Sequence, residues 1–283
     1  MQQKNIHWFP GHMVKAMKEI ESRLNVIDVI VEIIDSRAPI SSKNPFLEDL
    51  TKSKKRLLVF SKKDLCDMKK IGDFERYYQN FGYETIAVDL NNKKDIFEII
   101  KKTQDIGKDR QEKYLKRGMK VQPLRVMIIG IPNVGKSTLI NRLTKRNAAS
   151  VRNTPGHTRA QQWIRINENF ELLDTPGVLP PHYESKETAI NLALIGSIKD
   201  DILPRDELYS YLINFLNKEY PDCFRKRYGV EKNLNESDLT LAIAQKRGFI
   251  QKGGLLDEET TKKIVLKEFK DGVLTSVIID KLC

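Results

Sequence analysis

Two patterns of apolar and polar positions divide the sequence near Pro180. Before it, short β-branched runs alternate with segments whose apolar residues recur every three or four positions, which predicts strands alternating with helices. The predicted strands cover residues 26–34, 56–60, 84–88, 124–129, 162–166 and 170–173, the last two as a hairpin. The predicted helices cover residues 14–24, 44–52, 69–81, 93–103 and 138–143, and a basic stretch at 106–121 leads into the strand at 124. This alternation favours an α/β fold with a mostly parallel sheet flanked by helices.

After Pro180 only the helical spacing remains. The predicted helices there cover residues 188–199, 205–220, 236–247 and 258–271. A chain of 283 residues is long enough for one large domain or two modest ones. We therefore expect an α/β domain over residues 1–178 and a smaller, all-helical domain over residues 179–283.

A glycine-rich turn joins the strand at 124–129 to the helix that follows it. Its sequence is Gly130-Ile-Pro-Asn-Val-Gly-Lys-Ser137, and a strand, such a turn, Lys-Ser and a helix form the context of a phosphate-binding loop. Backbone N–H groups and the helix N-terminus would face the phosphates of a nucleoside triphosphate. Lys136 would reach the β- and γ-phosphates, and the Ser137 hydroxyl would bind Mg²⁺. The residues expected to contact the nucleotide here are Asn133, Val134, Gly135, Lys136, Ser137 and Thr138.

A base-reading motif is predicted at Ser61-Lys-Lys-Asp64, which follows the strand at 56–60. Ligands collect at such strand ends in open α/β sheets. The Asp64 carboxylate would accept the neighbouring N1–H and N2–H₂ donors of guanine, which adenine lacks, while the stem of Lys62 could cover the base. Ser61 stands where the usual residue is Asn, and we expect this departure to weaken the bracing of the loop. The last base-contacting turn belongs at Ala87-Val88-Asp89, which matches its usual pattern poorly.

Two loops after the phosphate-binding loop have the character of nucleotide switches. Arg152-Asn-Thr-Pro-Gly-His-Thr-Arg159 is polar and rich in helix breakers, and its Thr158 would close on Mg²⁺ and the γ-phosphate. Asp174-Thr-Pro-Gly177 follows the predicted hairpin. There Asp174 would hold Mg²⁺ through water, and the Gly177 N–H would contact the γ-phosphate.

The order of these motifs differs from that of a usual GTPase, in which the phosphate loop and the switches precede the base-reading motif. Here Ser61 to Asp64 comes first. Each motif still follows a strand of one sheet, so a circularly permuted chain can assemble the same site, because permutation is tolerated where junctions lie in surface connections. The predicted fold is therefore a circularly permuted P-loop GTPase domain followed by the helical domain.

The charge of the chain is unevenly distributed. The net charge is +11, and residues 185–283 hold 16 Lys+Arg against 16 Asp+Glu, which leaves 33 against 22 for the residues before them. A surplus confined to the α/β part favours a polyanionic partner such as nucleic acid, although solvated helix faces could account for part of it. The three scattered cysteines suit a reducing cytosol and argue against a metal site, and no apolar run is long enough to span a membrane.

These residues together resemble the ribosome biogenesis GTPase A family of circularly permuted bacterial GTPases. The resemblance covers nearly the whole chain, and it rests on Trp8-Phe-Pro-Gly-His-Met13, Asp35-Ser-Arg-Ala-Pro39, Gly130 to Thr138, Pro155-Gly-His-Thr158, Ala160-Gln-Gln-Trp163, Leu173-Asp-Thr-Pro-Gly177 and Lys246-Arg-Gly248 with Gly253-Gly254. It implies a cytoplasmic GTPase that assists late maturation of the large (50S) ribosomal subunit and contacts rRNA through its helical domain. It also implies K⁺ near the transferred phosphate, with Asn133 as its ligand. We expect the protein to be monomeric off the ribosome.

Hydrolysis needs an oriented water, which a Gln after Asp-x-x-Gly usually supplies, but here that position is Val178. The only histidines in the sequence are His7, His12, His157 and His182. His157 and His182 are nearest the two switches in sequence, whereas the resemblance favours His12. An imidazole at any of these positions could orient the water or act as a base near neutral pH.

Two rival functions remain open at this point. One is an ATP-dependent RNA remodelling enzyme, which a comparison of guanine and adenine nucleotide binding would separate from a GTPase. The other is a non-catalytic RNA-binding scaffold whose nucleotide site only stabilises the fold. The intact set of Lys136, Ser137 and Asp174 argues against a scaffold.

Overall fold

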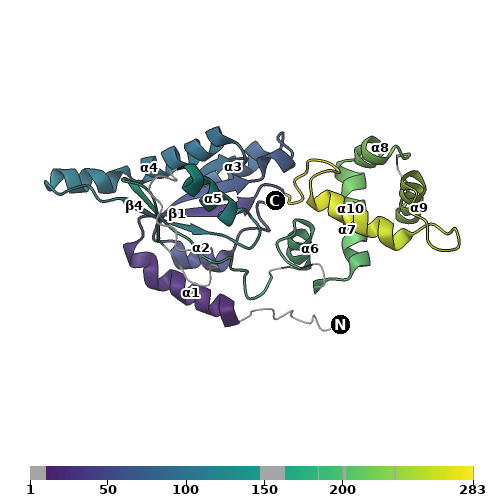
Figure 1. The fold of residues 1–283 in the computed structure, drawn as a ribbon, viewed down its shortest axis with the longest axis horizontal. Coiled ribbons are helices and arrows are strands. Elements are labelled where there is room, and N and C mark those ends of the chain that lie inside the picture. The colour runs from purple at the N-terminus through teal and green to yellow at the C-terminus, as the bar shows by residue number, and fades with distance from the viewer. Residues whose placement is uncertain (1–10, 147–162, 184, 200–201, 233, 283) are drawn as a thin grey trace.

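The computed structural model describes residues 11–146, 163–183, 185–199, 202–232 and 234–282. Within them, a six-stranded sheet with flanking helices forms one body, the α/β part, and the helices after the last strand form a second body beside it, the helical part (Figure 1). The predicted first switch at 152–159 and the residues of the opening motif before Gly11 lie outside the described residues.

The sheet contains β1 (Val29–Asp35), β2 (Lys55–Ser61), β3 (Glu84–Ala87), β4 (Leu124–Ile129), β5 (Trp163–Asn167) and β6 (Phe170–Leu173). Their order across the sheet is β3-β2-β1-β4-β6-β5, and every neighbouring pair is parallel except the β5–β6 hairpin. All residues of β1 are buried, as expected for a central parallel strand covered on both faces. The predicted mixed α/β sheet is confirmed, but β1 starts later than expected because residues Leu24–Val26 form a 3₁₀ turn.

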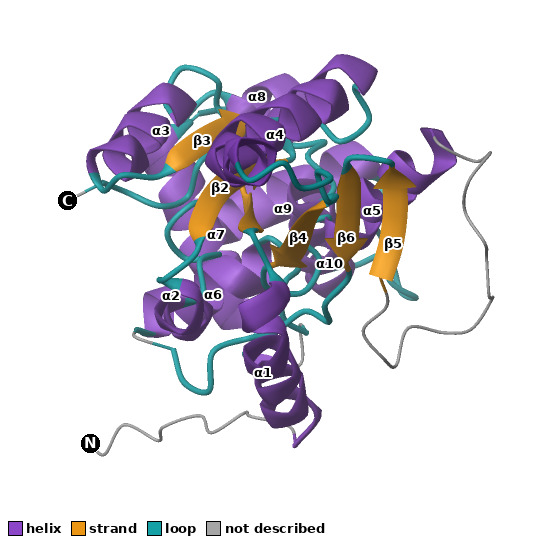
Figure 2. Cartoon of the chain, turned by 90° about the vertical axis from the view of Figure 1, so that its left-hand side faces the viewer, coloured by secondary structure: helices purple, strands orange, loops and turns teal. Residues whose placement is uncertain are grey.

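Five helices belong to the α/β part: α1 (Gly11–Arg23), α2 (Pro45–Thr51), α3 (Ile71–Asn80), α4 (Lys93–Lys116) and α5 (Lys136–Arg146). Helix α4 packs against β1, β2 and α5, whereas α1 and α2 lie on the side of the sheet away from α4 (Figures 1 and 2). The prediction that the helix ends at 103 is wrong, since α4 continues through the basic stretch to Lys116. Its second half projects beyond the sheet, so the apolar periodicity stops while exposed ion pairs such as Lys108–Asp105 continue (2.5 Å).

The helical part contains α6 (Lys186–Leu194), α7 (Arg205–Glu219), α8 (Cys223–Tyr228), α9 (Glu236–Arg247) and α10 (Glu258–Lys270). Side-chain caps fix three of its helix starts: Ser185, Asn235 and Asp257 accept hydrogen bonds from the backbone N–H groups of the first turn. Helix α6 ends before the predicted residue 199 because Gly196 turns the chain with a φ of 77°. The short helix α8 was not predicted.

The C-terminal segment returns to the α/β part, and Figure 1 shows the C-terminus between the two bodies. The backbone N–H of Val277 donates to the carbonyl of Leu65 (3.2 Å), and that of Ile279 donates to the carbonyl of Arg37 (2.7 Å). Ile278 is buried in a cluster with Phe60 and Tyr78. The boundary at 178/179 stays a prediction, because this tail extends the packing of the α/β part beyond it.

Candidate nucleotide site

The carboxyl edge of the sheet gathers the predicted nucleotide motifs. Parallel strands end at the same edge, so the residues that follow β1, β2, β3, β4 and β6 meet there. These residues include Ser61 to Asp64, Ala87 to Asp89, Gly130 to Ser137 and Asp174 to Gly177. The permuted chain thus brings its predicted base-reading and phosphate-binding loops to one edge.

The phosphate-binding loop turns tightly where its first glycine stands. Gly130 has a φ of 150°, and a Cβ there would lie 2.4 Å from the carbonyl oxygen of Ile33. Lys136 begins α5, and its Nζ donates to the carbonyls of Gly130 (2.9 Å) and Ile131 (2.6 Å). Burial lowers the pKa of Lys136 to about 8, although the Asp174 carboxylate opposes this shift. The loop therefore holds an ammonium group inside its own turn, where a phosphate group would meet it.

The Asp174–Gly177 loop lies against the phosphate-binding loop. A Cβ at Gly177 would lie 2.9 Å from the backbone of Pro132 and 3.0 Å from Lys136 Nζ, so only glycine fits this approach. The Val178 N–H donates to the carbonyl of Gly130 (3.3 Å). Burial raises the pKa of Asp174, and the Lys136 cation opposes that shift. A loop in this place can respond to a phosphate bound beside Lys136.

The donor chemistry at this edge suits Mg²⁺. Ser137 is exposed and presents a hydroxyl oxygen, and Asp174 presents a half-buried carboxylate. Hydroxyl and carboxylate oxygens are the hard ligands that Mg²⁺ takes together with substrate phosphates. Among the described residues, no group of three or more His, Cys, Asp or Glu could hold a metal by itself.

Ser61 links the base-reading loop to the phosphate-binding loop, and whether this link is weaker than one made by Asn stays a prediction. Its hydroxyl oxygen lies within hydrogen-bond distance of the carbonyl oxygens of Val134 (2.6 Å) and Ile34 (2.9 Å), either of which can accept its hydrogen, and the residue is fully buried. A hydroxyl is shorter than an amide, but the loop lies close enough to the end of β2 for it to reach. The exchange of Asn for Ser thus preserves a link between the base-reading and phosphate-binding loops.

The two base-reading segments are neighbours. The Lys63 N–H donates to the carbonyl of Val88 (3.0 Å), and Asp95 accepts both from the Asp89 N–H and from Lys63 Nζ (2.8 Å each). Lys62 adopts a left-handed conformation with a φ of 57°, which is uncommon outside glycine. Asp64 is exposed at the same edge. The Ala87 to Asp89 turn therefore lies beside the loop that carries Asp64, even though its sequence matched poorly.

A buried charge cluster at the end of β1 was not predicted. The Asp35 carboxylate is fully buried and accepts from the Arg37 guanidinium (2.8 and 3.0 Å) and from Lys62 Nζ (2.8 Å). Burial acts to raise the pKa of Asp35, but the Arg37 and Lys62 charges outweigh it and lower the pKa to about 2. The sequence did contain a sign of this cluster, since the opposite charges Asp35 and Arg37 stand at the end of a buried strand and charged side chains are buried only when they are paired.

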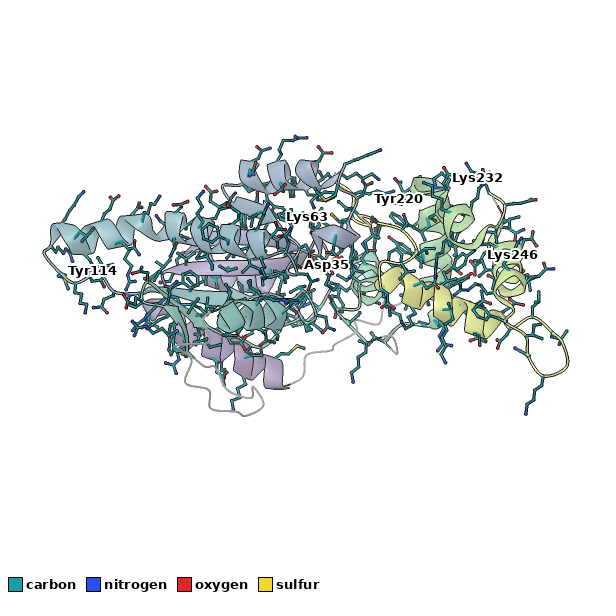
Figure 3. The ribbon with its side chains drawn as sticks, turned by 45° about the horizontal axis from the view of Figure 1, so that its top comes forward. Asp35, Lys63, Tyr114, Tyr220, Lys232 and Lys246 are labelled. Atoms are coloured by element: carbon teal, nitrogen blue, oxygen red, sulfur yellow. The ribbon has the colours of Figure 1, made fainter. Side chains whose placement is uncertain are left out.

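Arg37 also joins the two parts of the molecule. Its guanidinium is 1% exposed and donates to the carbonyls of Ile195 (3.1 Å) and Lys270 (2.8 Å), which follow α6 and end α10. Figure 3 shows Asp35 at the end of the sheet that faces the helical part. One side chain thus connects Lys62 of the base-reading loop, through Asp35, to two helices of the helical part.

Asn133 makes a second contact of this kind. Its φ is 62°, and its Nδ2 donates to the carbonyl of Gly196 (2.7 Å) just after α6. This bond occupies the side-chain N–H₂ and leaves the side-chain oxygen as the atom that could bind a cation. The phosphate-binding loop therefore touches the helical part directly.

Four of the residues considered for catalysis have no described side chain. His7, His157 and Thr158 lie outside the described residues, and His12 falls in α1 without a described side chain. His182 is exposed, and its ring lies edge-on to Phe46 with centroids 5.4 Å apart. The assignment of the residue that orients water stays a prediction.

Known proteins are similar to this chain in both sequence and fold. A family model described as a 50S ribosome-binding GTPase matches residues 125–221, starting at β4 and leaving out the strands that the permuted order places first. Ribosome biogenesis GTPase A of Bacillus cereus is 38% identical over 274 residues, covering 95% of this chain and 91% of that protein. Mitochondrial ribosome-associated GTPase 1 of Xenopus tropicalis is 36% identical over 257 residues, covering 87% of this chain and 81% of that protein.

Two solved structures share the fold. A GDP-bound YlqF structure aligns with a TM-score of 0.65 at 23% identity, covering 93% of this chain and 98% of that one. GNP-bound YlqF from T. maritima aligns with a TM-score of 0.63 at 22% identity, covering 95% and 100%. Because the sequence similarity to the bacterial proteins runs through both parts of the molecule, the chain belongs to the ribosome biogenesis GTPase A family.

Proposed function

We propose that this protein is a cytoplasmic, GTP-hydrolysing assembly factor that acts in late maturation of the large (50S) ribosomal subunit and binds rRNA or the pre-ribosome in a nucleotide-dependent manner. One observation carries the proposal: the Asp174–Gly177 loop lies against the phosphate-binding loop and is followed in the chain by the segment 178–185, the tether, which leads to α6 of the helical part. A contact made by the γ-phosphate at this loop can therefore act on the part of the chain proposed to touch rRNA.

In this proposal, the base lies between the two neighbouring segments that follow β2 and β3. Asp64 accepts the guanine donors, Lys62 covers the base, and Ser61 braces the loop against Val134. Ala87, Val88 and Asp89 form the other side of the base site. A carboxylate at Asp64 leaves adenine without matching donors, so the site selects GTP.

The phosphates lie on the turn from Asn133 to Thr138, where the backbone N–H groups and Lys136 balance their charge. Ser137, Asp174 and Thr158 are the proposed Mg²⁺ ligands, and bound Mg²⁺ would neutralise charge on the β- and γ-phosphates. Asn133 offers its side-chain oxygen to K⁺. Gly177 contacts the γ-phosphate through its N–H, and His12 orients the attacking water.

The proposed partner is the large subunit, and the protein is monomeric away from it. The positive surplus of the α/β part suits the phosphate backbone of rRNA. Among the described residues, no helix is both long enough and apolar enough to cross a membrane.

The experiment measures phosphate release from GTP and from ATP, each with and without isolated large subunits. We expect GTP to be the preferred substrate and large subunits to stimulate its hydrolysis, with small subunits as the matched control. Equal turnover of ATP would favour the RNA remodelling enzyme instead. Absence of turnover under every condition would favour the non-catalytic scaffold.

A further inference from the structure

A pocket of about 670 Å³ is lined by residues that lie outside the phosphate-binding loop. Three segments form its walls: residues 40–48 before and within α2, residues 77–83 at the end of α3, and residues 180–183 after the Asp174–Gly177 loop together with Thr188 of α6. Its size lies in the range of about 300–1,000 Å³ that is typical of small-ligand sites. None of its lining residues belongs to the nucleotide motifs, so the mechanism leaves it unexplained.

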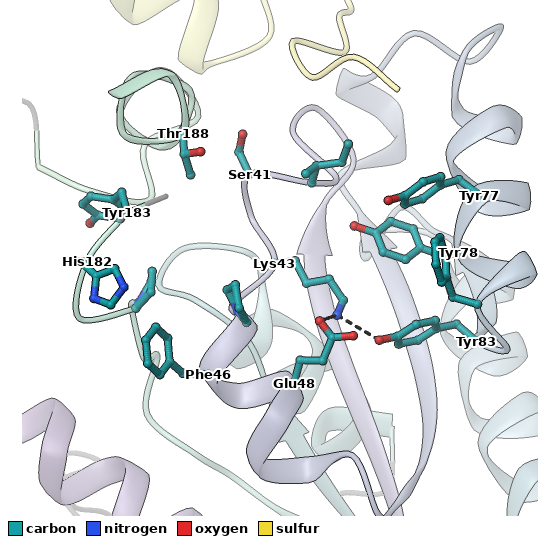
Figure 4. Close-up of a pocket in the computed structure, with 14 residues that line it drawn as sticks. Ser41, Lys43, Phe46, Glu48, Tyr77, Tyr78, Tyr83, His182, Tyr183 and Thr188 are labelled. Atoms are coloured by element: carbon teal, nitrogen blue, oxygen red, sulfur yellow. Dashed lines mark hydrogen bonds and ion pairs between the residues drawn. The ribbon is translucent and has the colours of Figure 1, made fainter. Parts of the chain in front are cut away.

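Aromatic side chains dominate two facing walls of this pocket, as Figure 4 shows. On one wall, Tyr77 contacts Tyr78 and Phe81 with ring centroids 5.2 and 5.1 Å apart. On the other, Phe46 and His182 form an edge-to-face pair. Phe81 is 66% exposed, an unusual position for a large apolar ring with no role. The walls therefore present flat faces to whatever enters between them.

Polar groups stand between the aromatic walls. Lys43 forms an ion pair with Glu48, donates to the Tyr83 hydroxyl (3.1 Å) and lies 4.9 Å from the centre of the Tyr83 ring. Figure 4 shows this group between the two walls. An ammonium, a carboxylate and a phenol supply donors and acceptors together, which a purely apolar ligand would leave unused.

A basic hollow of about 270 Å³ continues from the same pocket. It shares Glu48, Phe81 and Tyr83 with the aromatic pocket and adds Lys52, Lys54, Lys55 and Arg56. Lys52 and Lys55 pair with Asp49 and Asp109 at exposed positions, and such pairs are weak enough to exchange for another anion. Arg56 pairs with buried Glu32 and serves the fold instead.

We propose that this aromatic pocket binds unpaired bases of single-stranded RNA, while the adjoining lysines contact the phosphates of the same strand. Stacking on aromatic faces beside a positive track is how proteins hold unpaired RNA. The positive surplus of the chain is confined to the part that carries this pocket, which favours RNA over a peptide. The inference rests on the proposed function, since it names an RNA contact of the same assembly factor.

The pocket is also connected to the nucleotide switch. Asn44 caps α2 at the edge of the pocket, and its Nδ2 donates to the carbonyl of Val178 (2.8 Å). The Val178 N–H in turn donates to Gly130 of the phosphate-binding loop (3.3 Å). Pro180 and His182 of the pocket wall follow shortly after Val178 in the chain. A movement of the switch would therefore move one wall, and RNA affinity should differ between the two nucleotide states.

The test measures the affinity of the full chain for a short, unstructured, fluorescently labelled RNA by fluorescence anisotropy. The protein is saturated with a non-hydrolysable GTP analogue. Phe81→Ala should weaken binding between about 5-fold and about 100-fold, the range for loss of one stacked base. Phe97→Ala is the matched control, because Phe97 is an aromatic on α4, 51% exposed and outside both hollows. The control should bind RNA as the unsubstituted protein does.

Two further readouts separate the pocket from general charge attraction. Lys52→Gln should lower the salt dependence of RNA binding, by about 0.7 in the slope of log affinity against log salt for one phosphate contact. RNA containing 4-thiouridine should crosslink on irradiation to the peptide that carries Tyr77 to Tyr83. Adducts confined to other peptides would overturn the assignment of the pocket.

Loss of the pocket contact is distinguishable from failure of the proposed function. Phe81→Ala should keep the basal GTP hydrolysis of the unsubstituted protein, because Phe81 lies outside the nucleotide motifs. If Phe81→Ala binds RNA as tightly as Phe97→Ala does, the inference is wrong, even if large subunits stimulate hydrolysis. Weakened binding of a proline-rich peptide with unchanged RNA binding would assign the pocket to a protein partner instead.

Discussion

The nucleotide site and the junction between the two parts are held by contacts of different range. At the nucleotide site, Lys136 bonds to carbonyls only five and six residues before it, within one loop. At the junction, Arg37 reaches the carbonyl of Lys270, and Asp280 accepts from the N–H groups of Ile40 (2.6 Å) and Ser41 (2.8 Å). The turn that holds Lys136 can form from local sequence, whereas the junction requires that both ends of the chain fold.

Two side chains belong to both regions. Arg37 shares Asp35 with Lys62 of the base-reading loop, and Asn133 of the phosphate-binding loop bonds to Gly196. The nucleotide site therefore contacts the end of helix α6 directly through Asn133, and the end of helix α10 indirectly through Asp35 and Arg37. If these contacts matter for function, damage at the junction should change nucleotide behaviour as well as stability, whereas damage to one nucleotide motif should leave the junction intact.

The largest effect should come from the junction. Arg37→Met leaves Lys62 as the one ion-pair partner of the buried Asp35 carboxylate among the described residues, and removal of one member of a buried pair costs about 3–5 kcal/mol of unfolding free energy. Urea unfolding at neutral pH measures this loss. Arg76→Met, in an exposed pair with Asp73, is the control and should change stability little. Equal stability of the two variants would contradict the importance of the cluster.

The same cluster predicts an acid dependence. The pKa of Asp35 is lowered from its ordinary 3.8 to about 2, so its contribution to stability is present above about pH 4 and is lost as the pH falls toward 2. In Arg37→Met the pKa of Asp35 should be higher, so that less of this contribution exists and its loss is complete at a higher pH. Acid unfolding followed by circular dichroism compares the two proteins.

The next effect in size concerns the base. Asp64→Asn leaves guanine donors without their acceptor, at a cost of about 1–3 kcal/mol in GTP affinity. The new amide can donate to the altered ring edge of xanthine, so xanthosine triphosphate should lose less affinity than GTP or gain some. Calorimetric titration with both nucleotides measures the difference, with Asp73→Asn as the control. Equal losses for the two nucleotides would show that Asp64 does not read the base.

The smallest effect is expected at Asn133, which joins the two regions. Turnover of GTP should rise severalfold in potassium relative to sodium at equal ionic strength, and Asn133→Ala should abolish that difference. Asn141→Ala, an exposed position on α5, should retain it. Persistence of the potassium effect in Asn133→Ala would leave the contact with Gly196 as the only role of this side chain.

The nucleotide motifs could be predicted because each combines a local sequence with a strand end. Gly130 to Ser137 and Asp174 to Gly177 specify their own turns, and the parallel sheet then brings them together. The brace by Ser61 could not be predicted, because it depends on the distance between two loops rather than on residue type. The junction could not be predicted for a similar reason: across it, Arg37 bonds to backbone carbonyls and Asp280 accepts from two backbone N–H groups, and backbone partners leave no signature in the sequence.

In the proposed function, the bound nucleotide sets the affinity for the large subunit through the Asp174–Gly177 loop and the residues that lead from it into the helical part. The direct measurement is the affinity of the protein for isolated large subunits with a non-hydrolysable GTP analogue and with GDP. A coupling of about 1–3 kcal/mol predicts that the protein binds large subunits about 5- to 150-fold more tightly with the analogue than with GDP. Because the coupling is reciprocal, the subunit must raise the affinity for the analogue relative to GDP by the same factor. Glycines inserted between Pro180 and Pro181 should reduce this ratio. Equal subunit affinity in both nucleotide states would contradict the account.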